Sequence, residues 1–525
     1  LERLGRFWSR NSGNQTTFLS QISKCVHGKS LRPHFRSEDL EVTLGAMSSL
    51  RDSAPLLDAY LSYFETKRTP FTIPGHKQRA SRLDAGLGVV VDGDTPLYGG
   101  LDEIKLTNQI LKKAEALAAT LWKADFARFS TGGSTHANQA MILALGKPGD
   151  KVALSRTAHR SILSALVLAG LEPIWLSPQI DVATGVPTGI TVAEFEKVIN
   201  QKPIALLLTE PGYLGTLSDL PALVKSAHSH SIPVIVDAAW GGHFGFSPLT
   251  PKHCLQMGAD ALITSVHKAL PGYSASALLL AQGKLLNLDR IEQSFETTHT
   301  TSPAGAPLAS IDGCRALLQT RGDELISQLV SNVNAFKNSV QSHFDMPIFL
   351  NASDFAAGRF DLTKIVLRAN QLGASGVEIE KKLQAHNIRV EMADSDSVVF
   401  IATLADSLEE FDQLADVLLP ILKSSKNTPR PTATSLSWSV VPTVAISMRD
   451  AYFADTEMVA AKDCVGRISA DLIAPYPPGV AVVAPGEVLT AQILDGLSTT
   501  KVAGVRIAYA TDPTLASYRV VKKLA

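Results

Sequence analysis

Short apolar runs recur along the first half of the chain, and helical or loop segments separate most of them. They span residues 151–154, 173–176, 204–208, 233–236, 261–264 and 275–280. Their apolarity is continuous rather than alternating, which is typical of strands covered on both faces and therefore of a mostly parallel sheet. Between Asn108 and Trp122, apolar residues recur instead at helical spacing. The pattern predicts an α/β fold.

A polar, proline-containing stretch that begins at Ser424 is the best linker candidate in the chain. It separates a small α/β domain, predicted over residues 331–425, from a C-terminal domain, predicted over residues 435–525. The residues before them, 41–330, are predicted to form an N-terminal arm and a large domain. A length of 525 residues allows two to four domains of ordinary size.

The N-terminal residues have a different composition from the rest. From Leu1 to Ser37 there are seven Arg or Lys residues and a single acid, Glu2. Basic, acid-poor leaders resemble organelle transit peptides. We therefore predict a transit peptide or disordered leader over residues 1–40, with a plastid as the destination, and a mitochondrion or the cytoplasm as the alternatives.

Overall charge and cysteine spacing exclude several classes of protein. The formal net charge is −1, so no global basic field exists to attract nucleic acid or an anionic membrane. No apolar run approaches the roughly 18 residues of a membrane span. The four cysteines lie far apart without a CxxC pair, which gives neither a disulfide framework nor zinc-cluster spacing and favours a reducing compartment. We expect no metal site.

Two predicted strands end in residues that suit pyridoxal phosphate. Asp237 closes the run at 233–236, and Lys268 follows the run at 261–264. In an open parallel sheet, ligands bind at the carboxyl ends of the strands. A lysine amine forms a Schiff base with the aldehyde of pyridoxal phosphate, and a carboxylate keeps its ring nitrogen protonated. Taken singly, a surface lysine and a helix-capping aspartate are the alternatives.

Other predicted strand ends add candidates for the same site. Gly133, Ser134 and Thr135 precede a helical pattern, where backbone N–H groups and hydroxyls can hold a phosphate; Ser265 could reach the same group. His159 could stack on the cofactor ring, although a helix-capping or packed histidine is the alternative. His267 adjoins Lys268 and is a candidate proton donor or substrate-orienting group.

Several motifs together resemble one family. Pro-Gly-His-Lys stands at 74–77, Ser-x-His-Lys at 265–268, Tyr-Pro-Pro-Gly at 476–479 and Pro-Gly-Glu at 485–487, in that order. With Gly-Leu-Asp at 100–102 and Thr-Thr-Ser-Pro at 300–303, they make the chain resemble the fold-type I, pyridoxal-phosphate-dependent Orn/Lys/Arg decarboxylases. The resemblance runs from about residue 53 to residue 485 and beyond, and it implies the short form without an N-terminal wing domain.

The resemblance implies an aminotransferase-like large domain, a smaller α/β domain and a C-terminal α+β domain. It also implies that Lys268 binds the cofactor aldehyde, that Asp237 pairs with the ring nitrogen, and that His159 stacks on the ring. The loop carrying Thr301 and Ser302 would reach the phosphate of a neighbouring subunit, so a homodimer or higher homo-oligomer is expected. The implied reaction converts arginine, lysine or ornithine to its amine and CO2, in polyamine or diamine metabolism.

Some positions depart from the family pattern and leave the substrate open. The stretch 94–102 lacks the usual Thr-Glu pair, and Ala304-Gly-Ala306 replaces the usual aromatic residue after Thr-Ser-Pro. Glu487 is a candidate for holding the distal amine or guanidinium, with a helix-capping carboxylate as the alternative. The alternative functions are another fold-type I enzyme, such as an aminotransferase or lyase, and a non-catalytic regulatory homologue.

Overall fold

The computed structural model describes residues 50–66, 69, 71–95, 109–425, 428–431, 440–476 and 479–523. The predicted leader lies outside these ranges. So do the Gly-Leu-Asp motif at 100–102 and the prolines 477 and 478 of the Tyr-Pro-Pro-Gly motif. Within the described ranges, no helix is both long and apolar enough to cross a membrane.

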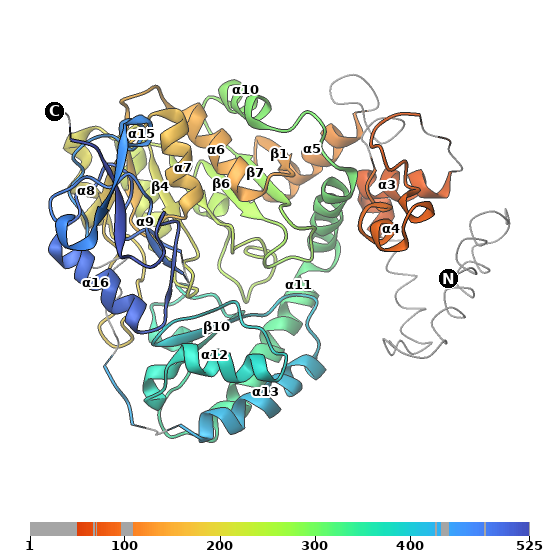
Figure 1. Ribbon diagram of the computed structural model, residues 1–525. Helices are drawn as coiled ribbons and strands as arrows, with labels where there is room; N and C mark the ends of the chain where they lie inside the picture. The colour runs from red at the N-terminus through yellow and green to blue at the C-terminus, as the bar shows by residue number, and fades with distance from the viewer. Residues whose placement is uncertain are drawn as a thin grey trace.

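A seven-stranded sheet lies at the centre of the large domain (Figure 1). Its order is β1-β7-β6-β5-β4-β2-β3, and all pairs from β6 to β3 are parallel, whereas β7 is antiparallel to both of its neighbours. The bounds are β1 Phe126–Ser130, β2 Lys151–Ser155, β3 Glu172–Leu176, β4 Leu206–Thr209, β5 Val234–Asp237, β6 Ala261–Ser265 and β7 Ala277–Ala281. The predicted α/β fold with a mostly parallel sheet is confirmed, and each of the six apolar runs overlaps a strand.

Two separate cores explain why the strands are apolar on both faces. Leu206 and Leu208 of β4 pack into the core that contains Trp122, at the end of α5 (Ile110–Trp122). Leu207, between them, packs into the other core with Met141 of α6 (Gly133–Leu145). Successive side chains of a strand point to opposite faces, so a sheet covered on both sides needs apolar residues at every position. Further helices on this domain are α7 Arg160–Ala169, α8 Val192–Glu196, α9 Leu220–Ser229 and α10 Leu288–Thr298.

A long helix, α11 (Gly305–Gln341), leads from the large domain into the small one (Figure 1). Ile326 lies in a core of the large domain and Val333 in the core of the small domain, so the predicted boundary at residue 330 falls inside a continuous helix. The small domain has a sheet of order β8-β10-β9. Its elements are β8 Lys364–Arg368, α12 Gly376–Ala385, β9 Met392–Ala393, β10 Ser397–Ile401 and α13 Leu408–Lys423.

The C-terminal region contains two small antiparallel sheets, β11·β14 and β12·β13. Its helix α15 packs against α7 of the large domain (Figure 1). Its elements are α15 Met448–Phe453, β11 Thr456–Ala460, β12 Ala474–Tyr476, α16 Ala491–Val502, β13 Arg506–Ala508 and β14 Ser517–Val521. At the other end of the described chain, α3 (Pro55–Glu65) packs on α11, and α4 (Ala85–Val91) follows it.

Candidate active site

A cavity of about 300 Å³ lies at the carboxyl edge of the central sheet. It forms there because β4, β5 and β6 end side by side, with Thr209 and Asp237 paired in register. The cavity brings together most of the residues that the sequence singled out. Its lining includes Gly133, Ser134, Thr135, His159, Asp237, Ser265, His267 and Lys268, together with Thr209, Pro211, Tyr213, Ala239, Trp240, Gly132 and Ala275.

The Asp237 carboxylate is held in place by two neighbours. One oxygen accepts a hydrogen bond from Nδ2 of Asn138 at 2.9 Å, and the other accepts from the backbone N–H of Ala239 at 3.2 Å. Asn138 Nδ2 also donates to Ser161 Oγ at 3.0 Å. Asp237 is buried, so these donors compensate for lost water and hold the carboxylate towards the cavity. Asn138 lies in α6, and nothing in the sequence marked it as a partner of Asp237.

His159 both caps a helix and lines the cavity. Its Nδ1 accepts a hydrogen bond from the backbone N–H of Ser161 at 3.2 Å, at the N-terminus of α7. In the neutral ring the proton therefore sits on Nε2. Burial lowers the pKa of His159, which favours the uncharged ring that can stack on a flat heterocycle. The two interpretations of this histidine are compatible.

The other end of the cavity has the donors that an anion requires. Helix α6 begins at Gly133, whose φ of 71° is unfavourable for residues with a side chain. The Ser134 and Ser265 hydroxyl oxygens lie 2.6 Å apart. A helix N-terminus with unpaired N–H groups and adjacent hydroxyls suits a phosphate.

Lys268 and His267 line the cavity beside the indole of Trp240. The Lys268 Nζ lies 4.3 Å from the centroid of the Trp240 ring. Burial lowers the pKa of the Lys268 amine, and the Asp237 carboxylate partly opposes this effect. His267 Nδ1 lies 3.1 Å from the carbonyl oxygen of Ser276. Because a carbonyl only accepts, Nδ1 carries a proton, and Nε2 is the nitrogen that remains available.

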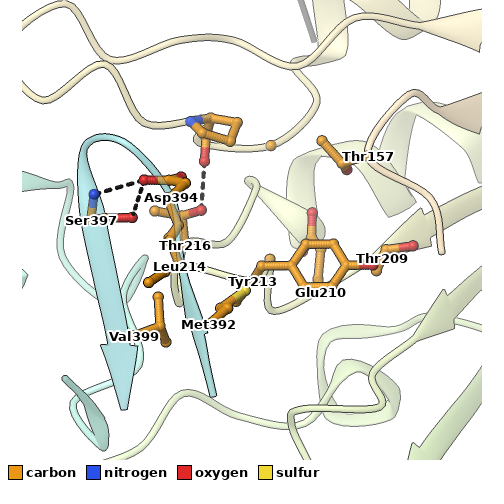
Figure 2. A pocket seen from close by; sticks show the side chains of 14 residues that line it. Thr157, Thr209, Glu210, Tyr213, Leu214, Thr216, Met392, Asp394, Ser397 and Val399 are labelled. Atoms are coloured by element: carbon orange, nitrogen blue, oxygen red, sulfur yellow. Dashed lines mark hydrogen bonds between the residues drawn. The ribbon is translucent and has the colours of Figure 1, made fainter. Parts of the chain in front are cut away.

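Two buried hydroxyls in the lining have no hydrogen-bond partner within the described residues. They are Thr209 Oγ1 and Tyr213 Oη. Neither residue was predicted from the sequence as part of the site, although Thr209 stands at the end of a strand. Figure 2 shows Thr209, Glu210 and Tyr213 on one side of a smaller adjoining pocket, opposite Asp394 and Ser397. Buried hydroxyls without partners indicate a missing polar group. Together with the amine, the carboxylate and the anion-binding end, they make a lining that fits pyridoxal phosphate.

Comparisons with known proteins agree with this lining. The family model described as the Orn/Lys/Arg decarboxylase major domain matches residues 54–357, and the model of the corresponding C-terminal domain matches residues 433–504. The chain is 32% identical to the arginine decarboxylase of Halalkalibacterium halodurans, over 90% of this chain and 99% of that protein. The chain belongs to the Orn/Lys/Arg decarboxylase family. It is therefore a pyridoxal-phosphate-dependent decarboxylase of basic amino acids.

Other members of the Orn/Lys/Arg decarboxylase family resemble the chain less closely in sequence. The inducible lysine decarboxylase of Escherichia coli is 22% identical, over 73% of this chain and 66% of that protein. The crystal structure of the Francisella novicida lysine decarboxylase superposes with a TM-score of 0.76 at 19% identity, covering 94% of this chain and 87% of that chain. At that identity the structural likeness shows the fold alone, which is the expected fold-type I architecture.

Three of the candidate residues of this decarboxylase lie away from the cavity. Thr301 and Ser302 are exposed on the loop between α10 and α11. Glu487 is buried, and its carboxylate forms an ion pair with Arg156, with oxygen–nitrogen distances of 2.6 and 3.0 Å. The same carboxylate accepts from the backbone N–H of Ala484 at 2.7 Å. With both oxygens engaged, Glu487 neither lines the cavity nor caps α16, and the geometry corrects both interpretations of this residue.

Proposed function

We propose that the substrate is L-arginine, which the enzyme converts to its amine and CO2. The carrying observation is sequence identity over nearly the full length. Relatives named arginine decarboxylase, from Halalkalibacterium halodurans and Bacillus subtilis, are both 32% identical over 90% and 89% of this chain. The relative named inducible lysine decarboxylase is 22% identical over 73%. The sequence alone left arginine, lysine and ornithine open.

In this proposal Lys268 and Asp237 are the central residues. Bound pyridoxal phosphate would supply an electron sink for the electron pair left when CO2 departs. The Lys268 amine would hold the cofactor at its aldehyde carbon, while Asp237 would keep a proton on the ring nitrogen at the opposite side. His159 would stack on the ring, and Ser134, Thr135, Ser265 and the N–H groups from Gly133 onward would hold the phosphate. The Thr209 hydroxyl, which is buried beside Asp237, would form a hydrogen bond to a substituent of the cofactor ring.

The α-carbon needs a proton after CO2 has left, and two groups could deliver it. His267 Nε2 can donate only from the doubly protonated ring, because the Nδ1 proton is engaged by the Ser276 carbonyl. The Lys268 amine must also be protonated in order to donate, but a lysine amine ordinarily keeps its proton to a higher pH than an imidazole does. We therefore propose Lys268 as the proton donor, and His267 as the residue that orients the substrate.

The assembly and the location are also proposals. We propose a homodimer in which Thr301 and Ser302 contact the phosphate bound by the neighbouring subunit. Both residues are exposed in the single chain and are therefore accessible to a second copy. A plastid location rests on the basic, acid-poor composition of residues 1–37.

The test is release of CO2 and amine by purified protein supplied with pyridoxal phosphate. L-arginine, L-lysine, L-ornithine and L-leucine would be compared, with Lys268→Ala as the control variant. We expect release from arginine that disappears in the variant. Equal or faster turnover of lysine or ornithine would refute arginine as the substrate, and release that survives in the variant would refute the role of Lys268.

A further inference from the structure

A second lysine lies against the same indole as Lys268. The Lys364 Nζ is 4.0 Å from the centroid of the Trp240 ring, and the Lys268 Nζ is 4.3 Å from it. Lys364 belongs to β8 of the small domain, whereas Trp240 follows β5 of the large domain. The contact therefore joins the two domains directly beside the candidate active site.

Lys364 is buried, with only 4% of its surface exposed. Within the described residues its ammonium forms no hydrogen bond, and the Trp240 ring is its contact. A cation over an aromatic face is stabilised electrostatically, and more strongly when water is excluded. The nearby Asp361 carboxylate is shared: its Oδ1 accepts from the Thr363 hydroxyl at 2.7 Å and lies 3.2 Å from His243 Nε2. The positive charge of Lys364 is thus incompletely neutralised.

We propose that Lys364 is a positioning residue for Lys268. Lys364 packs the Trp240 ring against the Lys268 amine, and its positive charge destabilises the protonated form of that amine by repulsion. This proposal rests on the role of Lys268 in the proposed function. Two like charges beside one ring repel each other, and burial weakens the screening of that repulsion. The effect matters because the amine must exchange protons to bind the cofactor and to deliver a proton to the α-carbon.

The neighbouring charges agree with this arrangement. Burial and, to a smaller extent, the charge of Lys268 lower the pKa of Lys364 to about 8, although the Asp361 carboxylate opposes the change. Exposed Glu391 faces both lysines. The charged or titratable groups facing Lys268 are Asp237, Glu391, Lys364 and His159. Those facing Lys364 are Asp361, with its partner His243, Glu391 and Lys268.

Another buried lysine provides a matched control. Lys337 of α11 also has a pKa lowered to about 8 by burial. Its ammonium donates to the carbonyl oxygen of Leu350 at 2.9 Å and lies 5.6 Å from the Phe360 ring, not beside Trp240. Replacing Lys337 by methionine thus removes a buried charge from the same domain without removing a neighbour of Lys268.

The experiment is a pH titration of the visible absorbance of the full chain loaded with pyridoxal phosphate. The variants are Lys364→Met, Lys364→Arg and Lys337→Met. We expect the midpoint of this absorbance titration to rise by about one pH unit in Lys364→Met. A shift of that size corresponds to the loss of a unit charge several ångströms away in a partly buried site. The midpoint should stay near the wild-type value in Lys364→Arg and in Lys337→Met.

A second variant keeps the test decisive if Lys364→Met does not fold. Asp361→Asn removes the carboxylate that raises the pKa of Lys364 and leaves every lysine in place. Lys364 should then lose its proton more readily, so the midpoint should rise, in the same direction as in Lys364→Met. An unchanged midpoint in the Lys364→Met or Asp361→Asn variant, or equal shifts in the Lys364→Met and Lys337→Met variants, would overturn the proposal alone. If no visible band depends on Lys268, the role of Lys268 fails, and this proposal fails with it.

Discussion

The Arg156–Glu487 ion pair gives the sharpest prediction about stability. Both side chains are about 1% exposed, and they connect the end of β2 to the C-terminal region, 331 residues further along the chain. Replacing Glu487 by Gln leaves the Arg156 guanidinium buried without its counter-ion. The Val482 carbonyl oxygen at 2.7 Å and the Trp175 ring, whose centroid is 4.4 Å from the guanidinium carbon, remain as partners and cannot balance a full charge.

Removing one partner of a buried ion pair lowers the free energy of unfolding by about 3–5 kcal/mol. A domain is stable by only about 5–15 kcal/mol, so we expect Glu487→Gln to lose about a fifth or more of that margin. Replacing both partners by methionine removes the buried charges together and should recover most of the loss. Urea unfolding of the wild type, the Arg156→Met variant, the Glu487→Met variant and the double Met variant would measure the coupling as a double-mutant cycle. The Gln variant would be unfolded alongside them.

The same variants separate a structural role of Glu487 from a substrate role. Below the unfolding transition, the Gln variant should turn over the basic amino-acid substrate with a KM within about twofold of the wild type, since both oxygens of the Glu487 carboxylate are engaged by Arg156 and Ala484. A Gln variant as stable as the wild type, but with KM raised tenfold or more, would refute the structural reasoning and restore Glu487 as a substrate contact.

Two further predictions concern buried carboxylates. Asp237→Asn should lower kcat by about 100- to 1000-fold, as losing a preorganised charge does; CO2 release at saturating cofactor measures it, and a loss under threefold would contradict the role of Asp237. Burial raises the pKa of Glu210 from 4.5 to about 7, so between these values the folded chain keeps a proton that the unfolded chain releases, and stability falls as pH rises. Glu210→Gln should therefore gain up to about 3 kcal/mol over the wild type at pH 8 and little at pH 4.5; equal urea midpoints at pH 8 would contradict this.

Local pattern was enough to predict six of the seven strands of the central sheet. Leu206, Leu207 and Leu208 are apolar in succession because the sheet is covered on both faces, and this requirement is visible in the sequence itself. Strand β1 escaped prediction because Arg128 interrupts its apolar run. The predicted boundary at residue 330 falls inside helix α11, which has side chains in two cores and no break between them.

For the candidate site, the sequence by itself determined which residues stand at the strand ends. Asp237 and Lys268 follow buried strands, and parallel strands bring their carboxyl ends to one edge; the cavity at that edge contains both. Only the tertiary structure decided which side chains pair across long separations. Asn138 with Asp237, Lys364 with Trp240, and Arg156 with Glu487 meet through packing of distant segments. Such contacts leave no local periodicity, because the direction of a side chain depends on the elements that surround it.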